Sequence, residues 1–184
     1  VYPTDKPILM TISKDFRRKD GGIKFNFAPA NQDELAECLS DPLWRICSGA
    51  LYKIIIKGDE GEDGLVMPFA PNRAQRRLLK ALWHRNVILK ARQLGFTTLV
   101  CIVWLDTALF NENMRCGIIA QDREAAEVIF RDKVKFAYEN LPEEIKVAMP
   151  LARDSAIELL FAHNNSSIRV ATSMRSGTIH RLHI

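Results

Sequence analysis

The sequence lacks any apolar run long enough to cross a membrane. The longest one, Leu99 to Phe110, is interrupted by Asp106 and is far shorter than the ~20 residues that a membrane-spanning helix needs. The first residues include Asp5 and Lys6 and contain no apolar stretch closed by small residues, so they do not have the pattern of a secretory signal. We therefore expect a cytosolic protein with no membrane partner.

Cysteine is scarce, and its spacing fits neither a disulfide scaffold nor a common zinc site. The chain has four cysteines and no C-x-x-C pair: Cys38, Cys47, Cys101 and Cys116. We predict that all four are reduced thiols. His180 and His183 would face opposite sides of a strand, and no neighbouring cysteine or carboxylate completes a zinc site with them. In the sequence, no G-x-S-x-G motif and no paired-carboxylate arrangement stands out, so it gives no support for acyl transfer or glycoside hydrolysis.

Acidic residues are absent from Gly64 to Leu105. Within this stretch, seven basic residues occur in a span of twenty: Arg73, Arg76, Arg77, Lys80, Arg85, Lys90 and Arg92. The whole chain has a formal net charge of +4, which permits a polyanionic partner without requiring one. We expect an anion site in the basic stretch. The alternative for Arg73 to Arg85 is a solvated helix face that packs through its leucines.

The remaining composition is that of an ordinary globular chain, with 47% hydrophobic and 26% charged residues. A length of 184 residues predicts one domain with room for an appendage. Residues 1–64 read as an N-terminal arm followed by two short helices, which begin near Asn31 and Asp41 and end near Ala50. A strand is expected over Leu51–Lys57, before an acidic surface loop with Asp59, Glu60, Glu62 and Asp63. Residues 65–184 form the second predicted region.

This second region alternates between helical and strand patterns, which predicts an α/β fold with a parallel sheet covered on both faces. A hairpin is expected between Ala156–Ala162 and Ser167–Ala171. The other predicted elements, in order, are a helix from Asn72, a strand over Asn86–Lys90, a helix over Phe96–Phe110, a strand over Met114–Ala120, a helix over Asp122–Asn140 and a strand over Thr178–Ile184.

The most informative segment runs from Val87 to Thr98, where an apolar strand, a turn and a helix are expected in succession. This is the setting of a phosphate-binding loop, in which backbone N–H groups hold phosphates and a Thr or Ser ligates Mg²⁺. Against the motif G-x-x-x-x-G-K-[ST], Gly95 and Thr97 match. Lys90 replaces the first glycine and Phe96 replaces the lysine. An ordinary strand, turn and helix is the alternative.

Several segments together resemble the large terminase subunit of tailed bacteriophages. They are KARQLGFTT, the upstream PNRAQRRLL, GIIAQDREAAEVIF followed by NLP, and SAIELLFAHNNSSIRVATSMRSGTIHRLHI. The likeness covers roughly Phe69 to Ile184. It implies a RecA-like P-loop ATPase core with a mostly parallel sheet. The phosphate loop of that family is commonly deviant, and its lysine sometimes stands at the start of the loop, which is compatible with Phe96.

The resemblance also implies roles for individual residues. The nucleotide-binding loop would consist of Lys90, Ala91, Arg92, Gln93, Leu94, Gly95, Phe96, Thr97 and Thr98. Thr97 would ligate Mg²⁺ and phosphate, and Lys90 or Arg92 would supply the loop's cation. Gln75 would read adenine, because an amide pairs with both a donor and an acceptor edge. Arg175 would act on ATP in a neighbouring subunit as an arginine finger.

Each of these roles has a simpler alternative. The alternative for Gln75 is an exposed helix residue, and the alternative for Arg175 is a loop residue bound to solvent or nucleic acid. The family's acidic pair, which holds Mg²⁺ and activates water, follows the strand that begins near Ile179, and we expect it beyond Ile184. This fragment alone is therefore expected to be inactive, and the family's nuclease domain would also lie downstream.

These features together predict the ATP-binding part of a viral DNA-packaging motor, with ATP and Mg²⁺ as cofactors. In the host cytoplasm, and transiently at the procapsid portal, its partners would be double-stranded DNA, the portal protein, the small terminase subunit and further copies of itself. One alternative is a helicase-like nucleic-acid translocase, which would continue into a second RecA-like domain. Another is a catalytically silent adaptor that keeps the fold.

Overall fold

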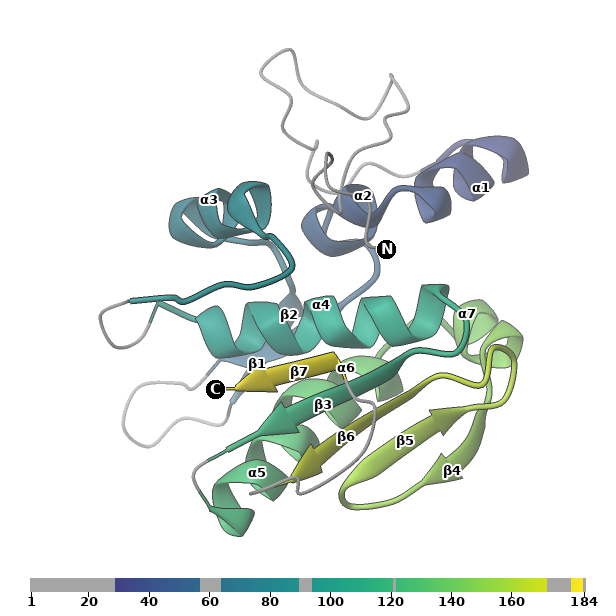
Figure 1. Cartoon of the computed structure of the whole chain (residues 1–184). Helices are drawn as coiled ribbons and strands as arrows, with labels where there is room; N and C mark the ends of the chain where they lie inside the picture. The colour runs from purple at the N-terminus through teal and green to yellow at the C-terminus, as the bar shows by residue number, and fades with distance from the viewer. Residues whose placement is uncertain (1–28, 57–63, 90–93, 121, 172–179, 184) are drawn as a thin grey trace. The chain divides into compact units, whose positions relative to one another are not determined.

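The computed structural model describes residues 29–56, 64–89, 94–120, 122–171 and 180–183, the last range by its backbone alone (Figure 1). The fold is α/β, with helices and a mixed β-sheet. It divides into two compact units, which are described separately below. Unit 1 comprises Val1–Leu51 and Phe69–Leu99, and unit 2 comprises Tyr52–Pro68 and Val100–Ile184. Residues 1–28 of the predicted N-terminal arm lie outside the described residues.

Unit 1 begins with two short helices, α1 (Gln32–Ser40) and α2 (Pro42–Cys47). Both start where their sequence signals predict. The Asn31 side chain accepts a hydrogen bond from the backbone N–H three residues later, and the Asp41 side chain caps α2 in the same manner. Trp44 of α2 is buried and belongs to a small apolar cluster with α1. The two predicted helix starts are therefore confirmed.

The second segment of unit 1 contains α3 (Arg73–Ala81) and the first turn of α4 (Phe96–Phe110). Both helices were expected from the sequence, and α4 has the predicted bounds. Leu79 is buried on the apolar side of α3, whereas Arg76 and Arg77 are exposed on its other side. The amphipathic pattern of α3 therefore predicts its orientation in unit 1 correctly.

The strand predicted over Asn86–Lys90 is wrong for the part that the structure describes. Residues 86–89 have no regular secondary structure and pair with no strand of the described residues. Val87 and Leu89 are fully exposed. A short apolar run forms a strand only where a neighbouring strand supplies partners for its backbone groups, and the described residues of unit 1 contain no strand. Lys90 itself lies outside the described residues.

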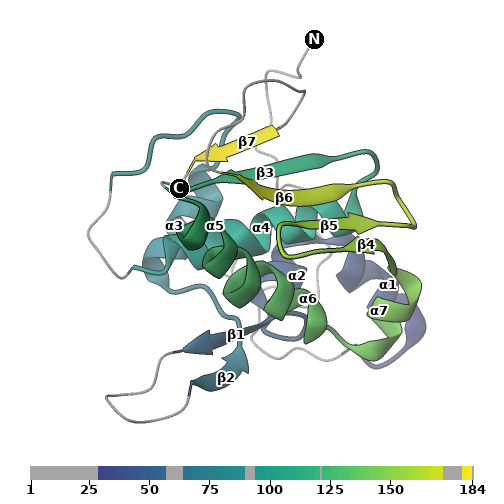
Figure 2. The same cartoon turned by 90° about the horizontal axis from the view of Figure 1, so that it is seen from below.

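Unit 2 is built on a five-stranded sheet, seen from a second direction in Figure 2. Its strands are β3 (Arg115–Ile119), β4 (Leu151–Asp154), β5 (Glu158–Phe161), β6 (Ser167–Ala171) and β7 (His180–His183), in the order β4-β5-β6-β3-β7. Strand β3 is parallel to β6 and β7, whereas β5 is antiparallel to β4 and β6. The sheet is therefore mixed, with two parallel and two antiparallel strand pairs, and the prediction of a mostly parallel sheet is confirmed only in part. The predicted hairpin of β5 and β6 is itself antiparallel, because a tight turn joins only antiparallel neighbours.

One face of this sheet forms the core of unit 2. Cys116 is paired with Ile168, and Ile118 with Val170, so these four side chains lie on the same face, and all are buried. On the opposite face, Arg169 is exposed. The helices of unit 2 lie on one side of the sheet in Figure 2. The prediction that both faces are covered is therefore wrong for the described residues.

The helix predicted over Asp122–Asn140 is present, but its middle is wound more widely than an α-helix. It consists of α5 (Arg123–Ile129), a π-helical segment, η1 (Phe130–Lys135), and α6 (Phe136–Glu139). Asp122 caps its N-terminus by accepting a hydrogen bond from the Ala125 N–H at 2.7 Å. The sequence pattern did not predict the short helix α7 (Glu143–Ala148) that follows.

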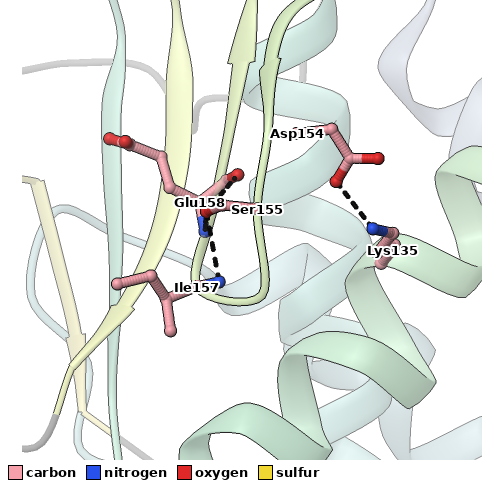
Figure 3. A network of polar contacts seen from close by, with 5 residues as sticks. All are labelled: Lys135, Asp154, Ser155, Ile157 and Glu158. Atoms are coloured by element: carbon pink, nitrogen blue, oxygen red, sulfur yellow. Dashed lines mark hydrogen bonds and ion pairs between the residues drawn. The ribbon is translucent and has the colours of Figure 1, made fainter.

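The turn between β4 and β5 is closed by Ser155 (Figure 3). Its hydroxyl accepts a hydrogen bond from the Glu158 N–H at 3.0 Å. The Ser155 N–H also donates a hydrogen bond to the Glu158 carbonyl, at 3.0 Å. Lys135 of η1 forms an ion pair with Asp154 at 2.7 Å. The turn and the long helix are thus linked beside the edge strand β4.

A separate antiparallel hairpin in unit 2 consists of β1 (Lys53–Ile56) and β2 (Leu65–Pro68). The strand over Leu51–Lys57 was predicted and β2 was not. The acidic residues Asp59, Glu60, Glu62 and Asp63 lie between them, outside the described residues. None of the helices in the described ranges is both long and apolar enough to span a membrane.

Candidate functional site

The candidate site begins at the N-terminus of α3, where Asn72 and Gln75 form a reciprocal capping box. The Asn72 Oδ1 atom accepts a hydrogen bond from the Gln75 N–H at 2.9 Å. In return, the Gln75 Oε1 atom accepts one from the Asn72 N–H at 2.8 Å. This exchange satisfies two backbone donors at the start of the helix. It also holds both side chains in fixed positions.

The same two side chains bind the turn that precedes α4. The Gln75 Nε2 atom donates a hydrogen bond to the Gly95 carbonyl at 2.7 Å. The Asn72 Nδ2 atom donates one to the Leu94 carbonyl at 3.2 Å. Two consecutive carbonyl groups of the turn are therefore held by the first turn of α3, across about twenty residues of sequence. Gln75 is 5% exposed, so its hydrogen bonds are largely shielded from water.

Two features favour glycine at position 95. Its φ angle is +69°, in the left-handed region that glycine adopts without steric cost. A Cβ atom at this position would lie 2.8 Å from Gln75 Nε2, closer than the two atoms can approach. The close contact between Gln75 and the Gly95 carbonyl thus depends on the missing side chain.

The turn leads directly into α4. The Gly95 carbonyl accepts the first hydrogen bond of the helix, from the Leu99 N–H at 3.1 Å. The first N–H groups of a helix have no acceptor within it, and they attract anions together with the helix dipole. Thr97 and Thr98 lie in this first turn and are half-buried. Within the described ranges, their hydroxyl groups have no hydrogen-bond partner. A phosphate and a hard cation such as Mg²⁺ fit this set of oxygen and N–H groups.

Basic side chains are abundant near this turn. The described part of unit 1 contains five exposed cations of the acid-free stretch: Arg73, Arg76, Arg77, Lys80 and Arg85. None of them takes part in an ion pair of the described residues. Four of the predicted loop residues, Lys90, Ala91, Arg92 and Gln93, lie outside the described residues, as does Arg175. The structure therefore describes only Leu94 to Thr98 of the predicted loop.

Several carboxylates of unit 2 have structural partners. Asp106, in the middle of α4, is buried and accepts a hydrogen bond from the Tyr52 hydroxyl at 2.8 Å. Asp154 pairs with Lys135, and Glu158 with Arg153. Across the described ranges, no group of three His, Cys, Asp or Glu side chains gathers in a way that could hold a metal ion.

Sequence reasoning identified Gln75, Gly95 and Thr97 but missed Asn72 as part of the site. The signal was present, because Asn followed three residues later by Gln is a capping-box pattern. It predicts that the two side chains meet. It does not predict that both reach the Leu94–Gly95 turn, which depends on how α3 packs within unit 1.

Comparison of the chain with models of known protein families gives no match, and comparison with curated proteins gives no significant match.

Proposed function

We propose that this chain is the ATP-binding part of a viral DNA-packaging motor, built on a RecA-like core. The observation that carries the proposal is the turn at Leu94–Gly95, held by α3, which opens α4 with Thr97 in its first turn. A glycine turn followed by a helix N-terminus with a Thr hydroxyl is the arrangement that binds nucleotide phosphates and Mg²⁺. Because the surrounding segments resemble the large terminase subunit, we assign this nucleotide chemistry to DNA packaging.

The roles of individual residues are those that the resemblance to the large terminase subunit implies. Thr97 would ligate Mg²⁺ and a phosphate oxygen, and backbone N–H groups of the first turn of α4 would hold phosphates. Lys90 or Arg92 would supply the cation that Phe96 does not. Arg175 would complete the site of a neighbouring subunit. The family's acidic pair would follow the last strand of the sheet.

The DNA partner is proposed from charge. A packaging motor must hold a polyanion without reading its sequence, because the whole genome passes through it. The exposed cations of α3 meet this requirement, and the stretch from Gly64 to Leu105 has no acidic residue. The portal protein, the small terminase subunit and further copies of the chain are the partners that such a motor would need.

The proposal is tested by titrating the chain with Mg-ATP while its melting temperature is followed. A ligand that binds only the folded state stabilises it, by about 2.7 kcal/mol at a concentration one hundred times its Kd. We expect Thr97→Ala and Lys90→Ala to lose most of this stabilisation. Thr107→Ala is the matched control, because Thr107 lies in α4 and its hydroxyl donates to the Val103 carbonyl at 2.8 Å. It should respond to Mg-ATP as the unchanged chain does.

A catalytically silent adaptor is the second candidate. It is favoured by residues 86–89, which do not form the strand that normally leads into a phosphate loop. The adaptor predicts no thermal shift with Mg-ATP in any variant, and that result would replace the motor proposal.

A further inference from the structure

We infer that Gln75 is a positioning residue that orients the backbone of the phosphate loop, and that it does so without reading the base. The inference rests on the proposed nucleotide site. It concerns the two hydrogen bonds by which the start of α3 holds Leu94 and Gly95.

The peptide bond explains how such a hydrogen bond orients a binding group. The Gly95 carbonyl and the Phe96 N–H belong to one planar trans peptide, so they point in opposite directions. When Gln75 holds the Gly95 carbonyl toward α3, it directs the Phe96 N–H away from α3. In the same way, Asn72 holds the Leu94 carbonyl and thereby directs the Gly95 N–H. The two capping side chains thus set the direction of two consecutive N–H donors at the start of α4.

The Gly95 carbonyl has two donors, the Gln75 amide at 2.7 Å and the Leu99 N–H at 3.1 Å. Gln75 therefore acts on the acceptor of the first hydrogen bond of α4. The contact is part-buried, with Gln75 only 5% exposed and Gly95 exposed. It also depends on Gly95, because a Cβ atom would lie 2.8 Å from the Gln75 nitrogen. The geometry couples the start of α3 to the start of α4.

This arrangement differs from what reading adenine requires. A primary amide has two N–H donors and one oxygen with two lone pairs. Gln75 uses one donor for Gly95, and its oxygen accepts from the Asn72 N–H. Both ends of the amide are therefore held by backbone within unit 1. A base reader needs both ends directed at the ligand.

The two roles predict different ligand dependences, which three probes separate: Mg-ATP, Mg-GTP and Mg-tripolyphosphate, which has no base. For Gln75→Met, we expect all three affinities to fall by the same factor, about tenfold for the lost hydrogen bond to the Gly95 carbonyl. The ratio of ATP to GTP affinity should be unchanged. Calorimetric titration of the whole chain measures each affinity. Gln32→Met is the matched control, because Gln32 is an exposed glutamine of α1 in the same unit.

A second variant tests the same inference without loss of the helix cap. Asn72→Ser keeps a side-chain oxygen that caps α3 but removes the amide donor to the Leu94 carbonyl. We expect it to weaken binding of all three probes equally, and by less than Gln75→Met, since its hydrogen bond is longer and exposed. Melting temperatures identify any variant that fails to fold.

Each remaining outcome overturns a defined statement. If Gln75→Met keeps its affinity for tripolyphosphate while the ratio of ATP to GTP affinity collapses, Gln75 reads the base and the inference is wrong. If Gln75→Met and Asn72→Ser bind all three probes as the unchanged chain does, the inference is wrong and the nucleotide site stands. If the unchanged chain binds none of the probes, the proposed function fails and the inference fails with it.

Discussion

Asp106 is a carboxylate buried in the middle of an apolar helix, and it is 3% exposed. Such a group is tolerated only when hydrogen bonds replace the water that it has lost. The Tyr52 hydroxyl provides one of these, at 2.8 Å, and Tyr52 is itself 1% exposed. The pair joins two segments of unit 2 that are 54 residues apart in the sequence.

We predict that Tyr52→Phe lowers the free energy of unfolding by about 1–3 kcal/mol, because it removes a donor from the buried carboxyl group of Asp106. Urea denaturation measures the change. Tyr138→Phe is the matched control. The Tyr138 hydroxyl donates to the uncharged Met149 carbonyl at 3.1 Å, so its loss should be smaller. An equal loss in the two variants would contradict the prediction.

The buried thiols predict how stability depends on alkaline pH. Burial raises the pKa of Cys101 to about 12 and that of Cys116 to about 12, from an ordinary value of 9.0. Between pH 9 and pH 12, the unfolded chain has lost these protons and the folded chain keeps them. The unfolded state then binds fewer protons, so stability falls as the pH rises, by up to about 1.4 kcal/mol per pH unit for each thiol.

The test is chemical denaturation from pH 8 to pH 10.5 in a phosphine reductant. We expect stability to fall less steeply in the double variant with Cys101→Ala and Cys116→Ala than in the unchanged chain. Tyrosines and lysines titrate equally in both proteins, so the difference isolates the thiols. Parallel curves would show that the thiols titrate in the folded state as they do in the unfolded one.

At the scale of elements, the turn between β5 and β6 holds the C-terminus of α4. The Asn164 Nδ2 atom lies within hydrogen-bond distance of three carbonyl groups: Ala108 at 2.8 Å, Leu109 at 3.0 Å and Asn111 at 2.8 Å. The Ser166 hydroxyl donates to the Asn111 carbonyl at 2.6 Å. The last carbonyl groups of a helix receive no hydrogen bond from an N–H group of the same helix. The hairpin turn therefore provides the C-terminal cap of α4.

We predict that Asn164→Asp destabilises the protein by about 1–3 kcal/mol. The substitution removes the donors and adds a negative charge at the negative end of the helix dipole. Thermal unfolding measures this loss. Asn165→Asp is the control, since the exposed Asn165 amide contacts only side chains, Asn113 at 2.9 Å and Arg115 at 3.2 Å, and no carbonyl of α4. A similar shift in both variants would argue against the cap.

The elements were predicted well where their signals are local. The capping residues Asn31, Asp41 and Asn72 start helices where expected, and the bounds of α4 were correct. The strand over Asn86–Lys90 was predicted from apolar β-branched residues alone. A strand needs a partner, and the described residues of unit 1 do not supply one. The π-helical turns of η1 also left no signal in the pattern.

At the scale of the whole molecule, the compact units are not continuous in sequence. Unit 2 contains the β1–β2 hairpin, whose residues fall in the sequence between the two segments of unit 1. The boundary predicted between residues 64 and 65 rests on the acidic loop, and the structure does not describe residues 57–63. Contacts between residues far apart in sequence, rather than composition, define these units.

The charge of the molecule predicts how it binds DNA if the proposed function is correct. We expect two double-stranded DNA fragments of unrelated sequence to bind equally, with a log affinity that falls linearly with log salt concentration, by about 0.9 for each phosphate contacted. Fluorescence anisotropy with labelled DNA measures both properties. The double variant Arg76→Glu and Arg77→Glu should bind more weakly and show a shallower slope. A strong preference for one sequence would contradict a packaging role.

The sequence by itself determined the α/β class, the capped helix starts, the hairpin of β5 and β6, and the glycine turn before α4. These features depend on hydrogen bonds and side-chain periodicity among residues that are close together in the sequence. Only the tertiary structure decided that the sheet is mixed and that one of its faces carries the core. It also decided that Asn72 and Gln75 bind the Leu94–Gly95 turn. Each of these depends on which distant groups come within hydrogen-bond distance, and that follows from the packing of the whole unit.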